Sequence, residues 1–353
     1  MKKEQETTKG IKEIARLAKV SIGTVDRVIN NRTGVSVKTK EKVLQIIAEL
    51  DYQPNIMARM LASKKVIRIA ALIPAVSNET GYWNAPLKGI NEAASEIRNF
   101  GVSVDLYFFD QNNKKTFTDQ CAVILDNGYD GILLAPMFEE EAVDFLDNCA
   151  KRELPFVLIN SDLEHQPRVA YIGPDLFQSG YLAGHLTKYL VKEAQQVLIV
   201  NISREINLQH HLLKKEEGFR ACLAAHDLSI KVSKVDINET SYDAVQQRLL
   251  QLFDLNKPDL VFVTNSRVSS VARFLQENAI EGVQLIGYDF LEENIEYLKN
   301  GTIDFLICQK PQEQGYRGLM SLYQHLISAP TVEQLQYMPI DIITKENYLY
   351  YRN

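Results

Sequence analysis

Residues 11–63 read IKEIARLAKVSIGTVDRVINNRTGVSVKTKEKVLQIIAELDYQPNIMARMLAS, and this stretch decides the first part of the fold. Its apolar residues recur at helical spacing in three short segments separated by turn-forming residues. Ser21 and Ser36 each stand where they would cap the N-terminus of the helix that follows. Pro54 breaks the pattern, and residues 58–63 have room for one more short helix. The stretch therefore predicts a small all-α domain of three short helices, with room for one more.

Charge separates this stretch from the rest of the chain. The whole sequence of 353 residues has a net charge of -6, which by itself argues against a nucleic-acid-binding protein. Residues 1–65, however, hold 14 lysines and arginines against 7 acidic residues, a balance of +7 that leaves -13 for the remainder. A basic head on an acidic body indicates DNA contact confined to one end, although a solvated basic tail would give the same count.

Cysteine usage and hydropathy bear on the compartment. The four cysteines (Cys121, Cys149, Cys222 and Cys308) are too far apart for a CxxC metal or redox site, so we expect buried thiols in a reducing compartment. The basic N-terminus MKKEQETTKG is not followed by the apolar segment of a secretory signal. No apolar run approaches the roughly 18 residues of a membrane span. A cytoplasmic protein is therefore expected.

From Ile67 onward the sequence alternates apolar runs with helical stretches. The runs are IRIAALIPAV, VSVDLYFFD, GILLAP, PFVLIN, VLIVNI, IKVSKVDI, LVFVTN, VQLIGYDF and TIDFLICQ. This alternation is typical of parallel, doubly wound α/β sheets. Nine runs are too many for one comfortable sheet, so the pattern predicts two α/β lobes. Several runs end in polar groups, at Asp110, Asn160–Asp162, Asn265, Asp289 and Gln309. Ligands bind beyond the carboxyl ends of such strands, so these groups should converge on one site.

The stretch 11–63 resembles, along its whole length, the headpiece of the lactose-repressor/galactose-repressor (LacI/GalR) family. The helix-turn-helix, the link and the YxPN…A…LA hinge appear in the family's order. The resemblance implies a sequence-specific transcription regulator, most simply a repressor. It implies that Ile22 and Gly23 read base edges in the major groove and that Arg27 reaches a base or a phosphate. It also implies DNA contacts for Ser21, Thr24, Asn30, Lys38, Asn55, Arg59 and Leu61, the last as a minor-groove wedge.

Two positions in the headpiece depart from the family pattern. Asp26 stands where a small hydroxyl residue near the phosphate backbone is usual, so it must pair with a neighbouring cation or accept from a base. Lys19 replaces the usual turn glycine, so the turn must accommodate a side chain if its backbone is left-handed. Both departures leave the fold prediction intact and make the operator sequence hard to infer.

Residues 67–330 resemble the family's sensor core, which is similar to ribose-binding-type periplasmic proteins and so implies a type I two-lobed α/β fold. GYWNAPLKGINEAA, YIGPDLFQSGYLAG and ICQKPQEQGY are among its anchors. The resemblance implies that Tyr82 and Trp83 sandwich a sugar ring. The implied polar wall comprises Asn160, Lys215, Asn265, Asp289 and Gln309, and Asp162 joins it as a strand-end group. Asn160 stands where Asp is usual and Lys215 where Arg is usual, which would suit an acidic sugar, a phosphorylated sugar or an inositol-like polyol.

These residues also have structural alternatives. Trp83 could be plain core, Asp289 a helix N-cap, residues 160–162 a turn, and Lys215 an exposed lysine on a charged helix. An enzyme is disfavoured because GxSxG, GxGxxG, GxxxxGK and HExxH are absent, and no metal or cofactor is expected. The headpiece argues against a pure solute-binding protein. A regulator whose input is a purine, an amino compound or a partner protein stays open.

The expected organisation is a homodimer on a pseudopalindromic operator. In each subunit we expect a headpiece over 1–53 and a hinge over 54–65. The core over 66–353 should comprise an N-lobe (66–171 and 310–335) and a C-lobe (172–309 and 336–353).

Overall fold

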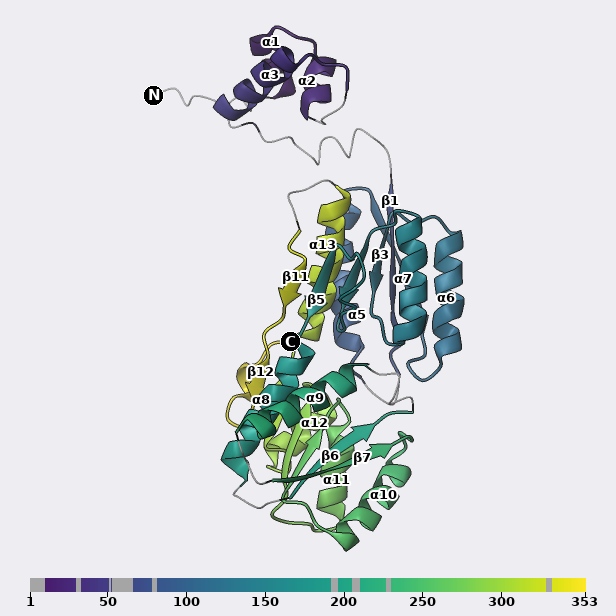
Figure 1. Ribbon diagram of the computed structural model, residues 1–353, viewed down its shortest axis with the longest axis vertical. Coiled ribbons are helices and arrows are strands. Elements are labelled where there is room, and N and C mark those ends of the chain that lie inside the picture. The colour runs from purple at the N-terminus through teal and green to yellow at the C-terminus, as the bar shows by residue number, and fades with distance from the viewer. Residues whose placement is uncertain are drawn as a thin grey trace. The chain divides into compact units, whose positions relative to one another are not determined.

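The computed structural model describes residues 10–29, 33–50, 52, 66–77, 81–191, 196–204, 210–226, 230–327 and 332–353. The chain divides into two compact units, Met1–Lys65 and Val66–Asn353, which are considered separately (Figure 1). The hinge predicted over 54–65 lies outside the described residues.

Within its described residues, the first unit contains three short helices around a small apolar core. They are α1 (Ile11–Ala18), α2 (Ile22–Ile29) and α3 (Val37–Glu49). Lys19 ends α1 in the left-handed conformation, with φ 57° and ψ 45°, so the turn does hold a side chain where glycine is usual. The Ser21 and Ser36 hydroxyls accept hydrogen bonds from the backbone N–H groups of Thr24 and Thr39, at 3.1 and 3.3 Å. Both predicted caps are confirmed.

The second unit begins with a six-stranded sheet. Its strands are β1 (Ile67–Pro74), β2 (Val102–Phe109), β3 (Gly131–Leu134), β4 (Phe156–Ile159), β5 (Ala170–Gly173) and β11 (Leu335–Tyr337). They are all parallel in the order β2-β1-β3-β4-β5-β11. Helices α5 (Asn84–Arg98) and α13 (Pro311–Leu326) pack together on one side, and α6 (Lys114–Asp126) and α7 (Glu139–Lys151) on the other (Figure 1).

A second six-stranded sheet repeats this design. Its strands are β6 (Gln196–Ile202), β7 (Lys231–Ile237), β8 (Leu260–Val263), β9 (Gln284–Tyr288), β10 (Phe305–Cys308) and β12 (Asp341–Ile343). The order is β7-β6-β8-β9-β10-β12, parallel except for the antiparallel pair β10–β12. Its helices are α8 (Leu176–Leu190), α9 (His210–Ala225), α10 (Tyr242–Leu255), α11 (Val268–Glu277) and α12 (Glu292–Lys299), and a 3-10 turn, η2 (Tyr348–Tyr350), follows.

Alternation along the central strands builds two cores in this lobe. Val197 and Ile199 of β6 belong to the cluster that includes α8 and α9 residues, whereas Leu198 and Val200 belong to the cluster with α10, α11 and α12. A parallel strand covered on both faces is apolar throughout, which is why VLIVNI shows no polar alternation. The predicted two-lobed α/β fold and its helical headpiece are confirmed.

The chain passes between the two sheets after Gly173, after Cys308 and after Tyr337. The first-lobe segments therefore extend two residues beyond the expected bounds at 171 and 335. The nine expected strands are all present, and β5, β11 and β12 are additional short ones. The four cysteines are buried and unpaired, and burial raises the pKa of each thiol.

Candidate functional site

A cavity lies between the two lobes, and its empty volume, including the part open to solvent, is about 640 Å³. The first lobe contributes the segment before α5 and the residues after β2, β3 and β4. The second lobe contributes the first residue of α8, helix α9, and the residues at or beyond the ends of β6, β8, β9 and β10. The lining residues are Tyr82, Trp83, Gln111, Asn112, Met137, Asn160, Leu176, Ile202, Ser203, His211, Lys215, Asn265, Ser266, Arg267, Asp289 and Gln309. The cavity thus lies where the carboxyl ends of both parallel sheets meet.

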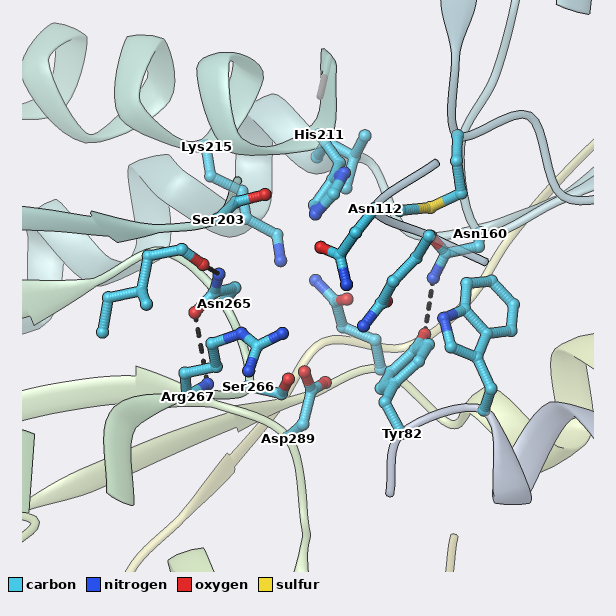
Figure 2. Close-up of a pocket in the computed structure, with 16 residues that line it drawn as sticks. Tyr82, Asn112, Asn160, Ser203, His211, Lys215, Asn265, Ser266, Arg267 and Asp289 are labelled. Atoms are coloured by element: carbon cyan, nitrogen blue, oxygen red, sulfur yellow. Dashed lines mark hydrogen bonds between the residues drawn. The ribbon is translucent and has the colours of Figure 1, made fainter. Parts of the chain in front are cut away.

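Tyr82 and Trp83 line this cavity in a geometry that differs from the expected sandwich. Their ring centroids are 5.2 Å apart and the planes are inclined at 85°, an edge-to-face contact. Two perpendicular rings in contact cannot hold a sugar ring between their faces, so the expectation of a sandwich by this pair is wrong. The Asn160 amide donates to the Tyr82 hydroxyl at 2.5 Å, which fixes the tyrosine against the end of β4 (Figure 2).

Asp289 presents a buried carboxylate to the cavity. It follows β9 in the left-handed conformation, with φ 74°, and its side chain is 7% exposed. Among the residues that the structure describes, no side chain or backbone N–H donates a hydrogen bond to this carboxylate. Burial raises its pKa to about 6, partly offset by the Lys215 ammonium. Helix α12 begins three residues later with Leu291 as its N-cap, so Asp289 is not a helix cap.

Lys215 is buried, contrary to the alternative of an exposed helix lysine. Its side chain comes from α9, is 4% exposed, and donates to the Thr264 carbonyl at 3.3 Å. The ammonium also lies 3.7 Å from the centre of the Tyr288 ring, a cation–π contact. Burial lowers the pKa of Lys215 to about 8, although the Asp289 carboxylate acts in the opposite direction. Figure 2 shows the Lys215 ammonium, the Arg267 guanidinium and the Asp289 carboxylate pointing into the same space.

Helix packing positions Lys215. Helices α8 and α9 are in close contact, and Gly180 of α8 lies directly against the Lys215 backbone. A Cβ at position 180 would be only 1.9 Å from the Lys215 carbonyl oxygen. Only glycine allows this approach, which places the Lys215 stem over the end of the sheet.

Asn265 and Gln309 line the cavity but are partly engaged within the protein. The Asn265 amide donates to the Ile202 carbonyl at 2.7 Å and accepts from the Arg267 N–H at 3.2 Å. The Gln309 amide donates to the Ser179 hydroxyl at 2.8 Å. These bonds hold both amides in place and leave each with part of its hydrogen-bonding capacity.

Asp162 does not line this cavity. Its carboxylate pairs with the buried Arg168 guanidinium at 2.8 Å and accepts from the Leu163 N–H at 2.8 Å. It lines a separate pocket with, among others, Glu164, Tyr171, Asp175 and Lys214. The structure thus brings seven of the eight expected effector residues together and places Asp162 elsewhere.

Nine lining residues escaped the sequence analysis. They are Gln111, Asn112, Met137, Leu176, Ile202, Ser203, His211, Ser266 and Arg267. The strand-end rule would have found most of the polar ones if extended two residues beyond each run. Asp110 illustrates this, because its carboxylate accepts from the Asn112 N–H and turns the chain so that Asn112 enters the cavity (Figure 2). His211, near the start of α9, had no such signal.

The headpiece presents its candidate DNA-contacting side chains to solvent. Ser21, Ile22, Gly23, Arg27 and Lys38 are exposed, and Thr24 is half-buried. Ile22 is 47% exposed at the N-terminus of α2, an apolar side chain without a folding role. Asn30, Asn55, Arg59 and Leu61 lie outside the described residues.

Comparison with known families agrees with both units. Residues 10–55 match the family of bacterial regulatory proteins named after lacI, and residues 69–329 match the periplasmic binding protein domain. The chain belongs to the LacI family of bacterial regulatory proteins. Among its relatives is the HTH-type transcriptional regulator DegA of Bacillus subtilis, 27% identical over 79% of this chain and 81% of DegA.

This LacI-family chain is also similar in fold to solved structures. A putative LacI transcriptional regulator from Bacteroides fragilis is 28% identical, with a TM-score of 0.74 over 82% of this chain and all of that one. GanP of Geobacillus stearothermophilus, a glucose-galactose binding protein, is 22% identical with a TM-score of 0.72 over 80% of this chain and 99% of that one, which shows a shared fold.

Membership of the LacI family settles the broad function. The chain is a DNA-binding transcription regulator with a periplasmic-binding-protein domain, and relatives such as DegA are transcription regulators. No helix in the described part of the chain has the length and apolar character needed to cross a membrane.

Proposed function

We propose that this regulator binds a pseudopalindromic operator as a homodimer and that a sugar or sugar derivative in the interlobe cavity controls its operator affinity, most simply as a repressor. The observation that carries the proposal is the Asp289 carboxylate, buried in the cavity without a hydrogen-bond donor in the described chain. The Asp289 oxygens face the cavity, so a ligand that donates hydrogen bonds to them would offset the cost of placing a charge in this buried site.

The rest of the lining suits a polyhydroxylated ligand. Asn112, Asn160 and Gln309 bring amides, and Ser203 and Ser266 bring hydroxyls, so donors and acceptors surround the space in which Asp289 lies. Asp289 can accept from two adjacent hydroxyls, and Lys215 can donate to a third oxygen. The apolar C–H surface of a sugar ring can pack against the Trp83 ring. The fold shared with a glucose-galactose binding protein supports the same ligand class.

The headpiece supports the DNA half of the proposal. In a helix-turn-helix the second helix enters the major groove with its N-terminal residues at the base edges. Ile22 can contact a thymine methyl group there and Arg27 can donate to guanine or to a phosphate. One headpiece reads one half-site, so two copies related by a two-fold axis require a pseudopalindrome. A regulator of this kind acts where its operator DNA is, so we expect the protein to act in the cytoplasm.

Lobe closure offers the coupling between the two functions. A ligand that contacts both sheets favours one spacing of the lobes, and this spacing can be transmitted to the headpieces of the dimer. Asn160 from the first lobe and Asp289 from the second face the same cavity, so a single ligand can contact both (Figure 2).

To test the proposal, the full-length protein is used to select DNA duplexes from a random library, and the selected sequence is then footprinted. The proposal expects two inverted half-sites and a dimer in the complex. Operator binding is then measured with a panel of pentoses, hexoses, sugar acids, polyols and purines. A change with a sugar-class compound that disappears in Asp289→Asn supports the proposal. A response to a purine, or one that persists in Asp289→Asn, contradicts its ligand half. A single half-site bound by a monomer contradicts its DNA half.

A further inference from the structure

The second crossing between the lobes is very short. Strand β10 ends at Cys308 and α13 begins at Pro311, so only Gln309 and Lys310 join the second sheet to the first-lobe helix. Gln309 lines the cavity, and Lys310 has φ 52° and ψ 54°, the left-handed conformation, immediately before a proline. That conformation is unfavourable for a residue with a side chain, so it persists only where the surroundings hold it.

The C-terminal segment provides that hold. The Lys310 ammonium donates to the Arg352 carbonyl, lies 3.5 Å from the Asp341 carboxylate, and lies 4.2 Å from the centre of the Tyr351 ring. The Lys310 backbone N–H also donates to the Tyr351 hydroxyl across a long 3.4 Å. The C-terminus lies between the two lobes (Figure 1).

Tyr351 also reaches the loop that carries the cavity carboxylate. Its ring packs on Phe290 with centroids 4.7 Å apart, and Phe290 directly follows Asp289. Tyr351 is 8% exposed, whereas the preceding Tyr350 is 81% exposed, so only one of two adjacent tyrosines is used in this way. One side chain therefore contacts both the crossing and the Asp289 loop.

We infer that Tyr351 and Arg352 form a strut that locks the Gln309–Lys310 crossing to the Asp289 loop, so that Lys310 and Tyr351 are positioning residues for closure of the cavity. The strut fixes the side from which Gln309 enters the cavity and the spacing of the lobes there. This inference concerns closure itself, so it holds whichever ligand the cavity binds.

Acrylamide quenching of Trp83 fluorescence tests the strut without ligand or DNA. Trp83 is the only tryptophan, is 3% exposed and lines the cavity, so opening of the lobes would expose it to the quencher. Lys310→Met and Tyr351→Ala should raise the open population, and with it the quenching constant, by about 2- to 10-fold, as expected for the loss of one or two polar contacts. Lys345→Met and Tyr350→Ala are the controls, because both side chains are largely exposed.

Urea unfolding of each variant separates positioning from a general loss of stability. A merely structural role would lower the unfolding midpoint but leave Trp83 as protected as in the controls under native conditions. That result for folded Lys310→Met would overturn the inference. If Tyr351→Ala fails to fold, Tyr351→Phe retains the ring contact with Phe290 and loses the hydroxyl, and its quenching, together with that of Lys310→Met, decides.

Discussion

The Lys215 ammonium lies 3.7 Å from the centre of the Tyr288 ring, although the next residue along the chain, Asp289, carries a carboxylate in the same cavity. In the described structure these two charged groups form no direct ion pair, and the Tyr288 ring and the Thr264 carbonyl hold the ammonium instead. Opposite charges kept apart in a buried site leave both open to a ligand that bridges them.

Asp289 should give effector binding a pH dependence. Its pKa lies at about 6, so the carboxylate that accepts ligand hydroxyls is lost as pH falls through that value. Affinity of the wild type should therefore drop between pH 7 and pH 5, whereas Asp289→Asn should bind about 10- to 100-fold more weakly at pH 7 and show a flatter profile. Isothermal titration at a series of pH values measures this, and an unchanged slope in the variant would contradict it.

Burial of Lys215 should lower the free energy of unfolding of the ligand-free protein. Its pKa is about 8 in the folded protein against 10.5 for the unperturbed group, so the unfolded chain binds more protons between these values. The free energy of unfolding therefore rises with pH from about 8 to about 10.5. Lys215→Met should abolish this rise and increase the free energy of unfolding at pH 7 by on the order of 1–3 kcal/mol, while effector binding is lost.

Lys214→Met is the matched control for this change. Lys214 is the neighbouring residue on α9, its side chain is 40% exposed, and it pairs with Glu217 at the surface. Its removal should shift the free energy of unfolding little. Urea unfolding at pH 7 and pH 9.5 compares the two, and equal effects would show that burial of Lys215 carries no penalty.

Gly180→Ala should destabilise the second lobe, because the new methyl group would lie 1.9 Å from the Lys215 carbonyl oxygen. Separating α8 from α9 should cost about 1–3 kcal/mol or more. Gly81→Ala adds the same methyl group with its nearest neighbour, the Asn84 amide, at 3.6 Å, and should be nearly neutral. Thermal unfolding of the two variants decides, and similar midpoints would refute the packing argument.

Arg27→Ala should weaken operator binding. Arg27 is exposed in α2, so the substitution leaves the folded headpiece intact. If Arg27 contacts a phosphate, the slope of log affinity against log salt falls by about 0.9, and if it reads guanine, discrimination at one base pair is lost. Lys42→Ala, exposed on α3, removes the same charge outside α2. Fluorescence anisotropy over a salt series compares them, and equal losses would place Arg27 outside the specific interface.

Local sequence signals were sufficient to predict much of the fold. Ser21 and Ser36 cap their helices because capping is a short-range interaction between a hydroxyl and an N–H three residues later. Apolar runs such as LVFVTN predict strands that are buried on both faces. The polar residues at the ends of these runs include several that line the cavity. Strands β11 and β12 escaped because three residues give too little pattern, whereas β5 escaped although β3, of the same four-residue length, was predicted.

The features of the site that could not be predicted from the sequence depend on tertiary geometry. Asp162 turns away from the cavity because Asn160 adopts φ 70° and Arg168 pairs with the Asp162 carboxylate, a partner identifiable only in the folded loop. The 85° angle between Tyr82 and Trp83 is likewise set by packing. Burial of Lys215 depends on the approach of α8 at Gly180, which no periodicity in α9 reveals.

The most direct test of the account follows Trp83 fluorescence while a panel of sugars, sugar acids, polyols and purines is titrated into the protein. Trp83 lines the cavity, so a ligand bound there should change its emission. The account predicts a saturable change with a sugar-class compound, lost in Asp289→Asn, and the same compound should alter operator binding over the same concentration range. A compound that alters operator binding equally in Asp289→Asn, without changing Trp83 emission, would show that the controlling ligand binds elsewhere and would contradict the central claim.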